Sequence, residues 1–278
     1  MLADVVPFLT CPACGAALRQ HDGALRCAAG HSFDVARQGY VNLLTGNARA
    51  GTADTAAMVL ARDAFLAGGH YAPLARRIAD LAAAAITGGL IVDAGGGTGA
   101  FLAAVLERIP AATGLVVDVS KHALRRAARV SPRAAAVAWD VWRPLPVRSG
   151  AAALVLDVLA PRNGAEFRRI LAGDGALLVV SPTPRHLAEL VGVLGMISVD
   201  ARKDERLESS LSTFFGLEAR ETLDIELRLS AVEAETVVQM GPSARHVDAE
   251  ALRRRVAALA PPLRATASFA LSLYRPIT

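Results

Sequence analysis

The sequence predicts an α/β protein in which an open, mostly parallel sheet carries helices on both faces and a small metal-binding module precedes it. Short apolar runs of strand length alternate with amphipathic helical segments through the middle of the chain. This is the pattern of parallel strands joined by crossover helices. All three cysteines lie within the first 27 of the 278 residues. The length suits a small appendage joined to one large domain.

The three cysteines and one histidine follow the ligand spacing of a small zinc site. Cys11 and Cys14 form a C-x-x-C pair, and Cys27 and His31 follow after a loop. Structural zinc is held in a tetrahedron by four thiolate or imidazole ligands. A disulfide framework would need an even number of cysteines, and a redox C-x-x-C would lie on a βαβ unit. We therefore predict a structural zinc ion within a module of residues 1–37.

The rest of the chain is predicted to form a linker over residues 38–53, where no periodicity is present, and one large domain over residues 54–278. Helices are expected where amphipathic segments follow a capping or first-turn residue, such as Asp54, Pro73 and Ser120. The expected helices span residues 54–66, 73–86, 98–107, 120–130, 165–171, 186–194, 231–240 and 248–259. The seven expected strands span residues 90–94, 114–119, 134–139, 152–159, 175–181, 217–229 and 263–274. Residues 194–212 offer no motif.

A glycine-rich loop follows the first strand of the large domain and indicates a cofactor site. Glycines at the carboxyl end of such a strand let the backbone approach a ligand closely and open the next helix. The spacing also satisfies the dinucleotide-binding pattern, and Asp118 after the second strand suits a ribose in either interpretation. The acid within the strand and the third glycine favour S-adenosylmethionine. The candidate residues of this loop are Asp93, Gly95, Gly97, Gly99 and Ala100.

The composition limits the classes of protein to which the chain can belong. No apolar run reaches the length of a membrane span, and residues 1–10 lack a signal-peptide pattern, so we expect a cytoplasmic protein without a membrane partner. The net charge of +4 and the isoelectric point of about 9.3 are compatible with a nucleic-acid partner without requiring one. The arginine clusters lie on predicted amphipathic helices, where solvated helix faces explain them equally well.

The spelling D-x-G-x-G-x-G resembles the first motif of the class I methyltransferases, and Asp118 and Asp140 resemble that family's ribose-binding and adenine-reading acids. Over nearly its full length the chain resembles the bacterial 23S rRNA guanine-N1 methyltransferases that act on the hairpin-35 region. It is most similar to the branch found with resistance to tylosin-type macrolides. Besides the cysteines and His31, the matching segments are Phe33–Leu44, Met58–Arg62, Gly69–Leu74, Asp93–Gly99, Asp118–Lys121, Ala160–Arg162, Pro184–Leu187 and Gln239–Pro242.

The resemblance implies a Rossmann-like methyltransferase domain with a seven-stranded, mostly parallel sheet and an N-terminal zinc ribbon. It implies S-adenosylmethionine as cofactor and 23S rRNA as partner, and a homodimer is compatible with it. In this family the cofactor is also touched at the positions of Tyr71 and His186, and by the end of the glycine loop at Gly99 and Ala100. Considered without the family, Tyr71 and His186 could equally be packing residues.

The chemistry of the implied reaction selects two further candidates. N1 of guanine carries a proton that must leave during methyl transfer, which calls for a general base. Asp157 is the candidate base, because the end of the fourth strand borders the methyl group in this fold. The alternative is that Asp157 binds a backbone amide or the cofactor's amino group. Arg162 is a candidate for steering a phosphate or the guanine O6.

Two other functions remain open at this point. One is methylation of a different RNA or of a small molecule, with the zinc module as a lid. The other is an RNA-binding protein that no longer catalyses. The zinc module and the distributed arginines argue against the small molecule, and the intact glycine loop with Asp118 argues against the non-catalytic protein.

Overall fold

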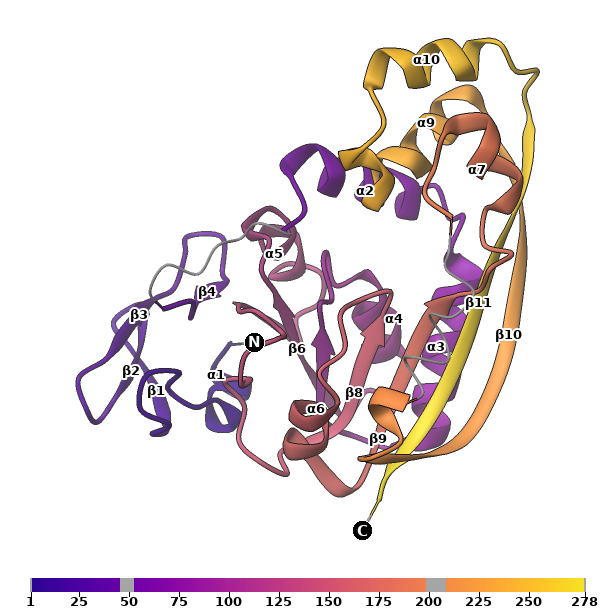
Figure 1. Cartoon of the computed structure of the whole chain (residues 1–278). Coiled ribbons are helices and arrows are strands. Elements are labelled where there is room, and N and C mark those ends of the chain that lie inside the picture. Colours follow the sequence, from indigo (N-terminus) through magenta and orange to yellow (C-terminus); the bar gives the residue numbers. More distant parts are fainter. Residues whose placement is uncertain (1, 46–52, 199–208, 278) are drawn as a thin grey trace.

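The computed structural model describes residues 2–45, 53–198 and 209–277, which form a small three-stranded sheet and a large eight-stranded sheet (Figure 1). The strands are β1 (Leu18–His21), β2 (Ala24–Cys27), β3 (Ser32–Asp34), β4 (Val41–Asn42), β5 (Gly89–Ala94), β6 (Ala112–Asp118), β7 (Ala134–Ala138), β8 (Ala152–Val158), β9 (Leu171–Pro182), β10 (Phe215–Leu229) and β11 (Leu263–Pro276). The helices are α1 (Leu2–Val5), α2 (Ala56–Ala67), α3 (Ala72–Ala85), α4 (Ala100–Arg108), α5 (Lys121–Ala127), α6 (Gly164–Ile170), α7 (Ala188–Leu194), α9 (Ala231–Gln239) and α10 (Ala249–Ala257), with short 3-10 turns at Val6–Phe8 and Pro242–Arg245.

The large sheet has the strand order β10-β11-β9-β8-β5-β6-β7-β4. All of its pairings from β9 to β4 are parallel, whereas β11 lies antiparallel between β9 and β10. The predictions of a mostly parallel sheet and of two strands near the end of the chain are therefore confirmed, and the structure adds that β11 runs antiparallel to both of its neighbours. Because parallel strands end at the same edge, the loops after β5, β6, β7 and β8 lie together.

The expected number of seven strands is wrong for the described residues, because β4 adds an eighth. Val41 pairs with Val137 and Asn42 with Ala138, so part of the segment expected to be a linker extends the sheet. A strand of two residues is too short to show periodicity, and its place depends on backbone hydrogen bonds to a distant edge. Residues 46–52 of that segment and 199–208 of the stretch without a motif lie outside the described residues.

The two faces of the large sheet bury separate cores. In β5, Ile91 faces the core covered by α3 and α4, whereas its neighbours Leu90 and Val92 face the core covered by α6, as the period of two in a strand requires. Helix α1 lies against β6 and β7 and contributes Val5 to the second core. The N-terminal helix, predicted to belong to the zinc module, therefore also packs on the large sheet.

Figure 1 shows α2, α7, α9 and α10 gathered at one end of the sheet, with the zinc module to one side of it.

Three expected details of the helices are wrong. Thr55 rather than Asp54 caps α2, since its side chain accepts the N–H of Met58. Helix α5 ends at Ala127 rather than at Val130. Helix α7 begins at Ala188 rather than at His186, because Leu187 has a left-handed φ of +54°, which is incompatible with an α-helix. No helix among the described residues is long and apolar enough to cross a membrane.

Candidate metal centre and cofactor crevice

The predicted metal ligands converge on one point of the N-terminal module. Ligand atoms of Cys11, Cys14, Cys27 and His31 all lie within 4.8 Å of one another. Cys14 Sγ lies 3.7 Å from Cys27 Sγ, and His31 Nδ1 lies 3.4 Å from Cys27 Sγ and 3.6 Å from Cys11 Sγ. Tetrahedral zinc, with Zn–S of about 2.3 Å and Zn–N of about 2.0 Å, separates its ligands by about 3.4–3.8 Å. The donor set and its spacing therefore fit structural zinc.

Two tight turns present these ligands. The N–H of Gly15 donates to Cys11 O at 2.8 Å, and the N–H of Gly30 donates to Cys27 O at 3.1 Å. Both glycines have positive φ, at +75° and +85°, which residues with a Cβ rarely adopt. The pKa of Cys27 is lowered to about 6: burial opposes the shift, but hydrogen bonds from His31 and nearby backbone N–H groups outweigh it. The turns therefore favour the thiolate, which is the form that binds metal.

The loop over residues 139–149, between β7 and β8, joins the zinc module to the large domain. The N–H of Thr10 donates to Pro146 O at 3.0 Å, and the N–H of Arg148 donates to Phe8 O at 2.9 Å. The guanidinium of Arg148 also lies over the Phe8 ring. The zinc module is therefore attached through backbone hydrogen bonds to the loop that runs from the end of β7 to the start of β8.

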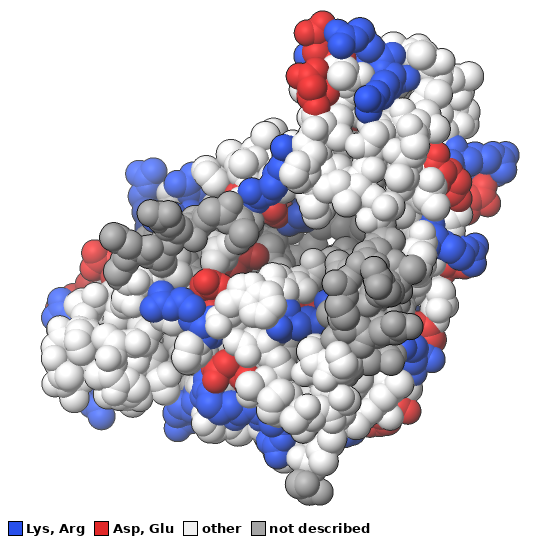
Figure 2. Space-filling model, viewed as in Figure 1, with Lys and Arg blue, Asp and Glu red and all other residues white. Residues whose placement is uncertain are grey.

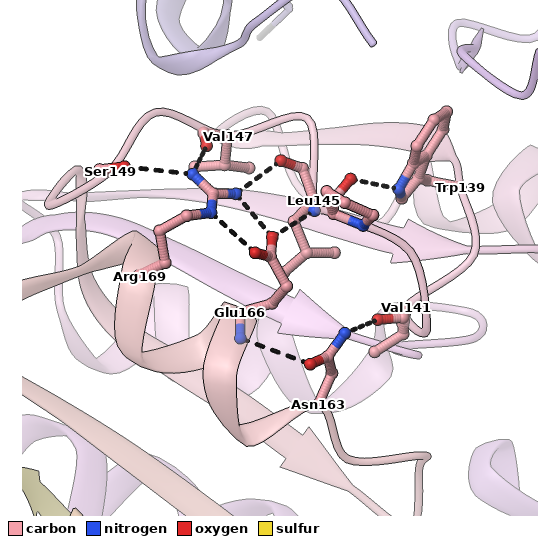
Figure 3. Close-up of polar contacts among 9 residues, drawn as sticks. Trp139, Val141, Leu145, Val147, Ser149, Asn163, Glu166 and Arg169 are labelled. Atoms are coloured by element: carbon pink, nitrogen blue, oxygen red, sulfur yellow. Dashed lines mark hydrogen bonds and ion pairs between the residues drawn. The ribbon is translucent and has the colours of Figure 1, made fainter. Parts of the chain in front are cut away.

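Helix α6 fixes the same loop from the other side (Figure 3). Arg169 donates to the carbonyl oxygens of Leu145 and Val147, each at 2.8 Å. The carboxylate of Glu166 accepts the N–H of Leu145 at 2.6 Å and pairs with Arg169 at 2.7 Å. At the start of α6, Asn163 Nδ2 donates to the carbonyl oxygen of Val141 at 3.0 Å. The backbone of this loop is thus held by side chains of one helix.

The glycine loop leaves no room for side chains. A Cβ on Gly95 would lie 2.7 Å from the Cβ of Ala160, and one on Gly96 would overlap Asp93 Oδ2. Gly95 and Gly97 have φ of +72° and +57°, so both also use a backbone conformation that favours glycine. The carboxyl end of β5 therefore has a backbone that strongly favours glycine, at the place where the glycine motif predicted a cofactor site.

Asp93 is almost fully buried beneath this loop. Its two carboxylate oxygens have no hydrogen-bond donor among the described residues. Burial and, to a lesser extent, the nearby charge of Asp118 raise its pKa to about 7. A buried carboxylate without a donor is costly in free energy. Its position beside the glycine loop fits a crevice that receives a ligand with hydrogen-bond donors.

Asp118 follows β6 and already has two backbone partners. Its Oδ2 accepts the N–H of Gly97 at 2.9 Å, and its Oδ1 accepts the N–H of Ser120 at 2.7 Å. Burial raises its pKa, and these two hydrogen bonds oppose that shift. The structure thus gives Asp118 a role that sequence reasoning missed, which is to hold the glycine loop against the start of α5. Each carboxylate oxygen keeps a lone pair for a ligand.

Aromatic side chains from distant segments of the chain pack against one another. Tyr71 contacts Phe65 and Phe269 edge to face, with ring centroids 5.1 Å apart in both pairs, and His186 lies 4.7 Å from Phe269. The hydroxyl of Tyr71 and Nδ1 of His186 are buried without a hydrogen-bond partner among the described residues. Burial raises the pKa of Tyr71 and lowers that of His186 to about 4, so both are neutral near pH 7. Two neutral polar atoms therefore remain available to a ligand.

Asp157 and Arg162 form a buried ion pair at the end of β8. Arg162 Nε lies 3.2 Å from Asp157 Oδ1, and both side chains are nearly inaccessible to solvent. Asp140, after β7, lies at the same edge, where its Oδ1 accepts the N–H of Trp142 at 3.0 Å. The residues expected to bind the cofactor and the residues expected to act on the substrate therefore occupy neighbouring loops of one sheet edge.

Arg62 is a residue to which sequence reasoning gave no role, although it lies in one of the matching segments. It pairs with Asp54, and its Nη2 donates to Met240 O at 2.8 Å. A Cβ on Gly97 would lie 3.4 Å from its Nη1. Arg62 therefore connects α2 and the end of α9 to the glycine loop. Its partners are far apart in sequence, so only the fold could show this.

The fold and the site define a class I S-adenosylmethionine-dependent methyltransferase with an N-terminal zinc ribbon. Two solved structures share the fold at a TM-score of 0.51. One is a provisionally assigned methyltransferase of Bacillus halodurans, 15% identical over 73% of this chain and 99% of its own. The other, from Haloferax volcanii, is a complex of the Trm112 activator with a provisionally assigned methyltransferase, 18% identical over 80% of this chain and 97% of the matched chain.

Sequence comparison defines the family more closely. The zinc-ribbon family described as "RlmA, N-terminal" matches residues 9–49. The 23S rRNA (guanine(748)-N(1))-methyltransferase of Streptomyces fradiae is 49% identical over 100% of both chains. A protein of Micromonospora griseorubida, provisionally named a 23S rRNA guanine-N1 methyltransferase, is 50% identical over 100% of both chains. The chain belongs to the family of 23S rRNA guanine-N1 methyltransferases.

Proposed function

We propose that the protein transfers the methyl group of S-adenosylmethionine to N1 of one guanine in the hairpin-35 region of 23S rRNA. The observation that carries the proposal is the 49% identity to the Streptomyces fradiae protein over the whole of both chains, because the name of that relative specifies guanine 748 and its N1. The described crevice supports it, since it offers unpartnered polar groups beside a glycine loop and an ion pair at the neighbouring strand end.

The cofactor-binding roles follow from the placement of the side chains. Asp118 would accept hydrogen bonds from the ribose hydroxyls while it holds Gly97, and Asp140 would read the adenine edge. Asp93, Tyr71 and His186 present their buried polar atoms to the rest of the cofactor. When bound, S-adenosylmethionine supplies an electrophilic methyl group on a sulfonium centre. The protein's own contribution is to orient that group and to exclude water from it.

The substrate nitrogen sets the remaining requirements. N1 lies on the Watson–Crick edge, so the guanine must leave its stack or pair to reach the crevice. Its proton must also leave, and Asp157 is the carboxylate at the strand end beside the transfer site. The ion pair with Arg162 holds Asp157 in one position. Arg162 in turn directs the guanine O6 or a phosphate toward this pair.

The rRNA would bind across the zinc module and the adjoining face of the large domain. Gly39 lies against Ala128 at the end of α5, which places the exposed Arg37 near that helix. Lys121 and Arg125 on α5 are exposed, and so is Arg129 just after the end of that helix. Among the described residues these four cations form no ion pair. Figure 2 shows Lys and Arg side chains in several groups on the zinc-module side and below the hollow in the surface, with fewer acids among them.

A surface of this kind binds phosphates and releases counterions, so the logarithm of the affinity for RNA should fall linearly with the logarithm of the salt concentration. A protein that acts on rRNA works in the cytoplasm.

A methyl group on N1 blocks the Watson–Crick edge and adds bulk near the macrolide path, so reduced macrolide binding is the expected consequence. That the protein forms a homodimer is a further prediction, with which the resemblance to the family is compatible.

The test is transfer of labelled methyl from S-adenosylmethionine to 23S rRNA, followed by nucleoside analysis and primer extension. We expect 1-methylguanosine and a reverse-transcriptase stop one nucleotide before a single guanine in hairpin 35. A methyl on an exocyclic amine or a ribose would contradict the assignment. Label found only on small molecules would favour the alternative substrate class, and RNA binding without transfer would favour a non-catalytic protein.

A further inference from the structure

Trp142 is an exposed aromatic side chain on an otherwise fixed loop. It is 64% exposed, whereas Trp139, the other tryptophan of the chain, is buried and donates its Nε1–H to Pro144 O at 3.0 Å. In the parts of the chain that the structure describes, the indole of Trp142 has no hydrogen bond and no ring contact. A single exposed apolar residue is ordinary, so any function must follow from where this one is held.

The backbone on both sides of Trp142 is held by side chains. Its own N–H donates to Asp140 Oδ1 at 3.0 Å, and the carbonyl of Val141 accepts from Asn163 Nδ2 at 3.0 Å (Figure 3). On its other side, the guanidinium of Arg143 lies 4.7 Å from the centroid of the Trp139 ring. The indole is therefore presented to solvent from a fixed backbone, so little conformational entropy of the loop is lost when a partner binds.

The loop places this indole between two regions of the molecule. Asn163, which holds Val141, directly follows Arg162, the partner of Asp157. Farther along the same loop, Pro146 and Arg148 bond to the zinc module. Trp142 therefore lies on the connection between the zinc module and the ion pair at the end of β8.

We propose that Trp142 is a stacking platform for an unpaired rRNA base that neighbours the target guanine; the inference rests on the proposed function. A guanine that presents N1 loses its stacking partners in the RNA, and an adjacent base is then also exposed. Every base has an aromatic face, so an indole can hold it without reading its sequence. The exposed Arg148 on the same loop supplies the positive charge that a phosphate backbone requires, which favours nucleic acid over an apolar protein segment.

The experiment compares Trp142→Ala, Trp142→Phe and the wild-type protein in binding a hairpin-35 RNA. Alanine should weaken RNA binding by about 5- to 150-fold, the range for removing one base–aromatic stack. Phenylalanine, which keeps a flat aromatic face, should retain most of the affinity. Affinity for S-adenosylmethionine should be the same in all three. The matched control is Leu217→Ala, because Leu217 is 50% exposed on β10 at the opposite edge of the large sheet.

Tryptophan fluorescence reports the contact directly. RNA should quench the emission of the wild-type protein, and Trp142→Phe, which retains only the buried Trp139, should lose most of that quench. The assignment is overturned if Trp142→Ala binds RNA as tightly as the wild type does. It is also overturned if that variant loses affinity for S-adenosylmethionine while RNA binding is kept, since the indole would then serve the cofactor. A wild-type protein that binds and is quenched but transfers no methyl to the RNA refutes the proposed reaction and still supports the stacking role.

Discussion

The zinc centre and the cofactor crevice are built in opposite ways. All four metal ligands lie between Cys11 and His31, on two turns of one small module. The proposed cofactor crevice would draw its polar groups from the ends of separate strands and from loops far apart in sequence, as the buried, unpartnered atoms of Tyr71, Asp93 and His186 illustrate. A local site can be read from spacing, because a few residues fix its geometry. A site at the edge of a sheet exists only after the topology has formed.

The difference extends to what each residue does. Each predicted zinc ligand has a single role, which is to bind the metal, so the set of donor atoms alone identifies that role. In the crevice, Asp118 holds two backbone N–H groups and still has lone pairs for a ligand, and Asp157 is already paired with a buried arginine. Substitutions in the crevice should therefore change both stability and activity. Substitutions of the zinc ligands should change metal binding and the local fold of the zinc module without disturbing the crevice.

The largest expected effect is the loss of zinc from the local site. Replacing Cys11 and Cys14 together by serine removes two of four ligands, so the bound metal should fall from near one per chain to near zero. Because metal binding and folding are coupled in such modules, the residues around β1–β3 should lose protection while the large domain keeps its fold. Elemental analysis and hydrogen exchange measure the two outcomes.

His21→Ala is the control for this experiment, because the His21 side chain is 65% exposed and lies outside the ligand cluster. It should leave the zinc content unchanged. A double cysteine variant that retains stoichiometric zinc, or a native protein without metal, would refute the proposed centre. Global unfolding of the variant would instead show that the two regions depend on each other more than their separate construction suggests.

The next effect is on turnover in the crevice. Asp157→Asn keeps the shape of the side chain and removes its basicity, so methyl transfer should slow by about 10²–10⁴-fold if Asp157 is the base. Affinity for S-adenosylmethionine and for RNA should be nearly unchanged. The measurement is single-turnover methylation together with equilibrium binding of both ligands.

Asp174→Asn, at an exposed position within β9, is the control and should have no effect on the rate. The buried ion pair allows another result. Removing the charge of Asp157 leaves Arg162 buried without its carboxylate, which typically costs about 3–5 kcal/mol of stability. A variant with a lower melting temperature and normal turnover of the folded fraction would assign Asp157 to structure.

How much the sequence could predict follows the same division. The ligands, the glycine loop and the order of strands and helices were predictable, because each depends on spacing or periodicity over a short segment. The eighth strand was not, because β4 has two residues and pairs with a partner almost a hundred positions away. The roles of Arg62 and Asn163 could not be predicted either. A side chain that donates a hydrogen bond to a distant backbone carbonyl leaves no periodic pattern in the sequence.

A smaller effect should come from filling the space beneath the glycine loop. A methyl group on Gly96 would overlap Asp93 Oδ2, so Gly96→Ala must shift the loop or the carboxylate. Overpacking of this kind costs about 1–3 kcal/mol. If the shifted loop is the part that contacts the cofactor, affinity for S-adenosylmethionine should fall by about 5- to 150-fold. Calorimetric titration measures it.

Gly173→Ala is a close match for comparison, since a Cβ at Gly173 meets nothing within 4 Å and its φ is not positive. That variant should bind the cofactor as the wild type does and change stability by no more than about 0.5 kcal/mol. Equal behaviour of the two variants would mean that the crevice tolerates a displaced loop. The close fit between Gly96 and Asp93 would then have no bearing on cofactor binding.

The last effect is a pH dependence that originates at Asp93. Its pKa rises from the ordinary 3.8 to about 7, because burial and then the charge of Asp118 disfavour the ionised form. Between these two values the unfolded chain has released the proton that the folded chain still binds. Stability therefore falls as pH rises through this window, by on the order of 1 kcal/mol per unit at most, and this contribution is complete below about pH 4 and lost above about pH 7.

Asp93→Asn removes this titration and leaves the other groups in place. From pH 5 to pH 7, the free energy of unfolding in urea should therefore fall more steeply for the wild type than for the variant. Saturating S-adenosylmethionine should reduce the difference, because a ligand with hydrogen-bond donors and positive charge favours the ionised carboxylate and lowers its pKa. Parallel curves for the two proteins would show that Asp93 titrates near its ordinary pKa. A difference that the cofactor leaves unchanged would place Asp93 outside the contact surface and restrict its role to supporting the glycine loop.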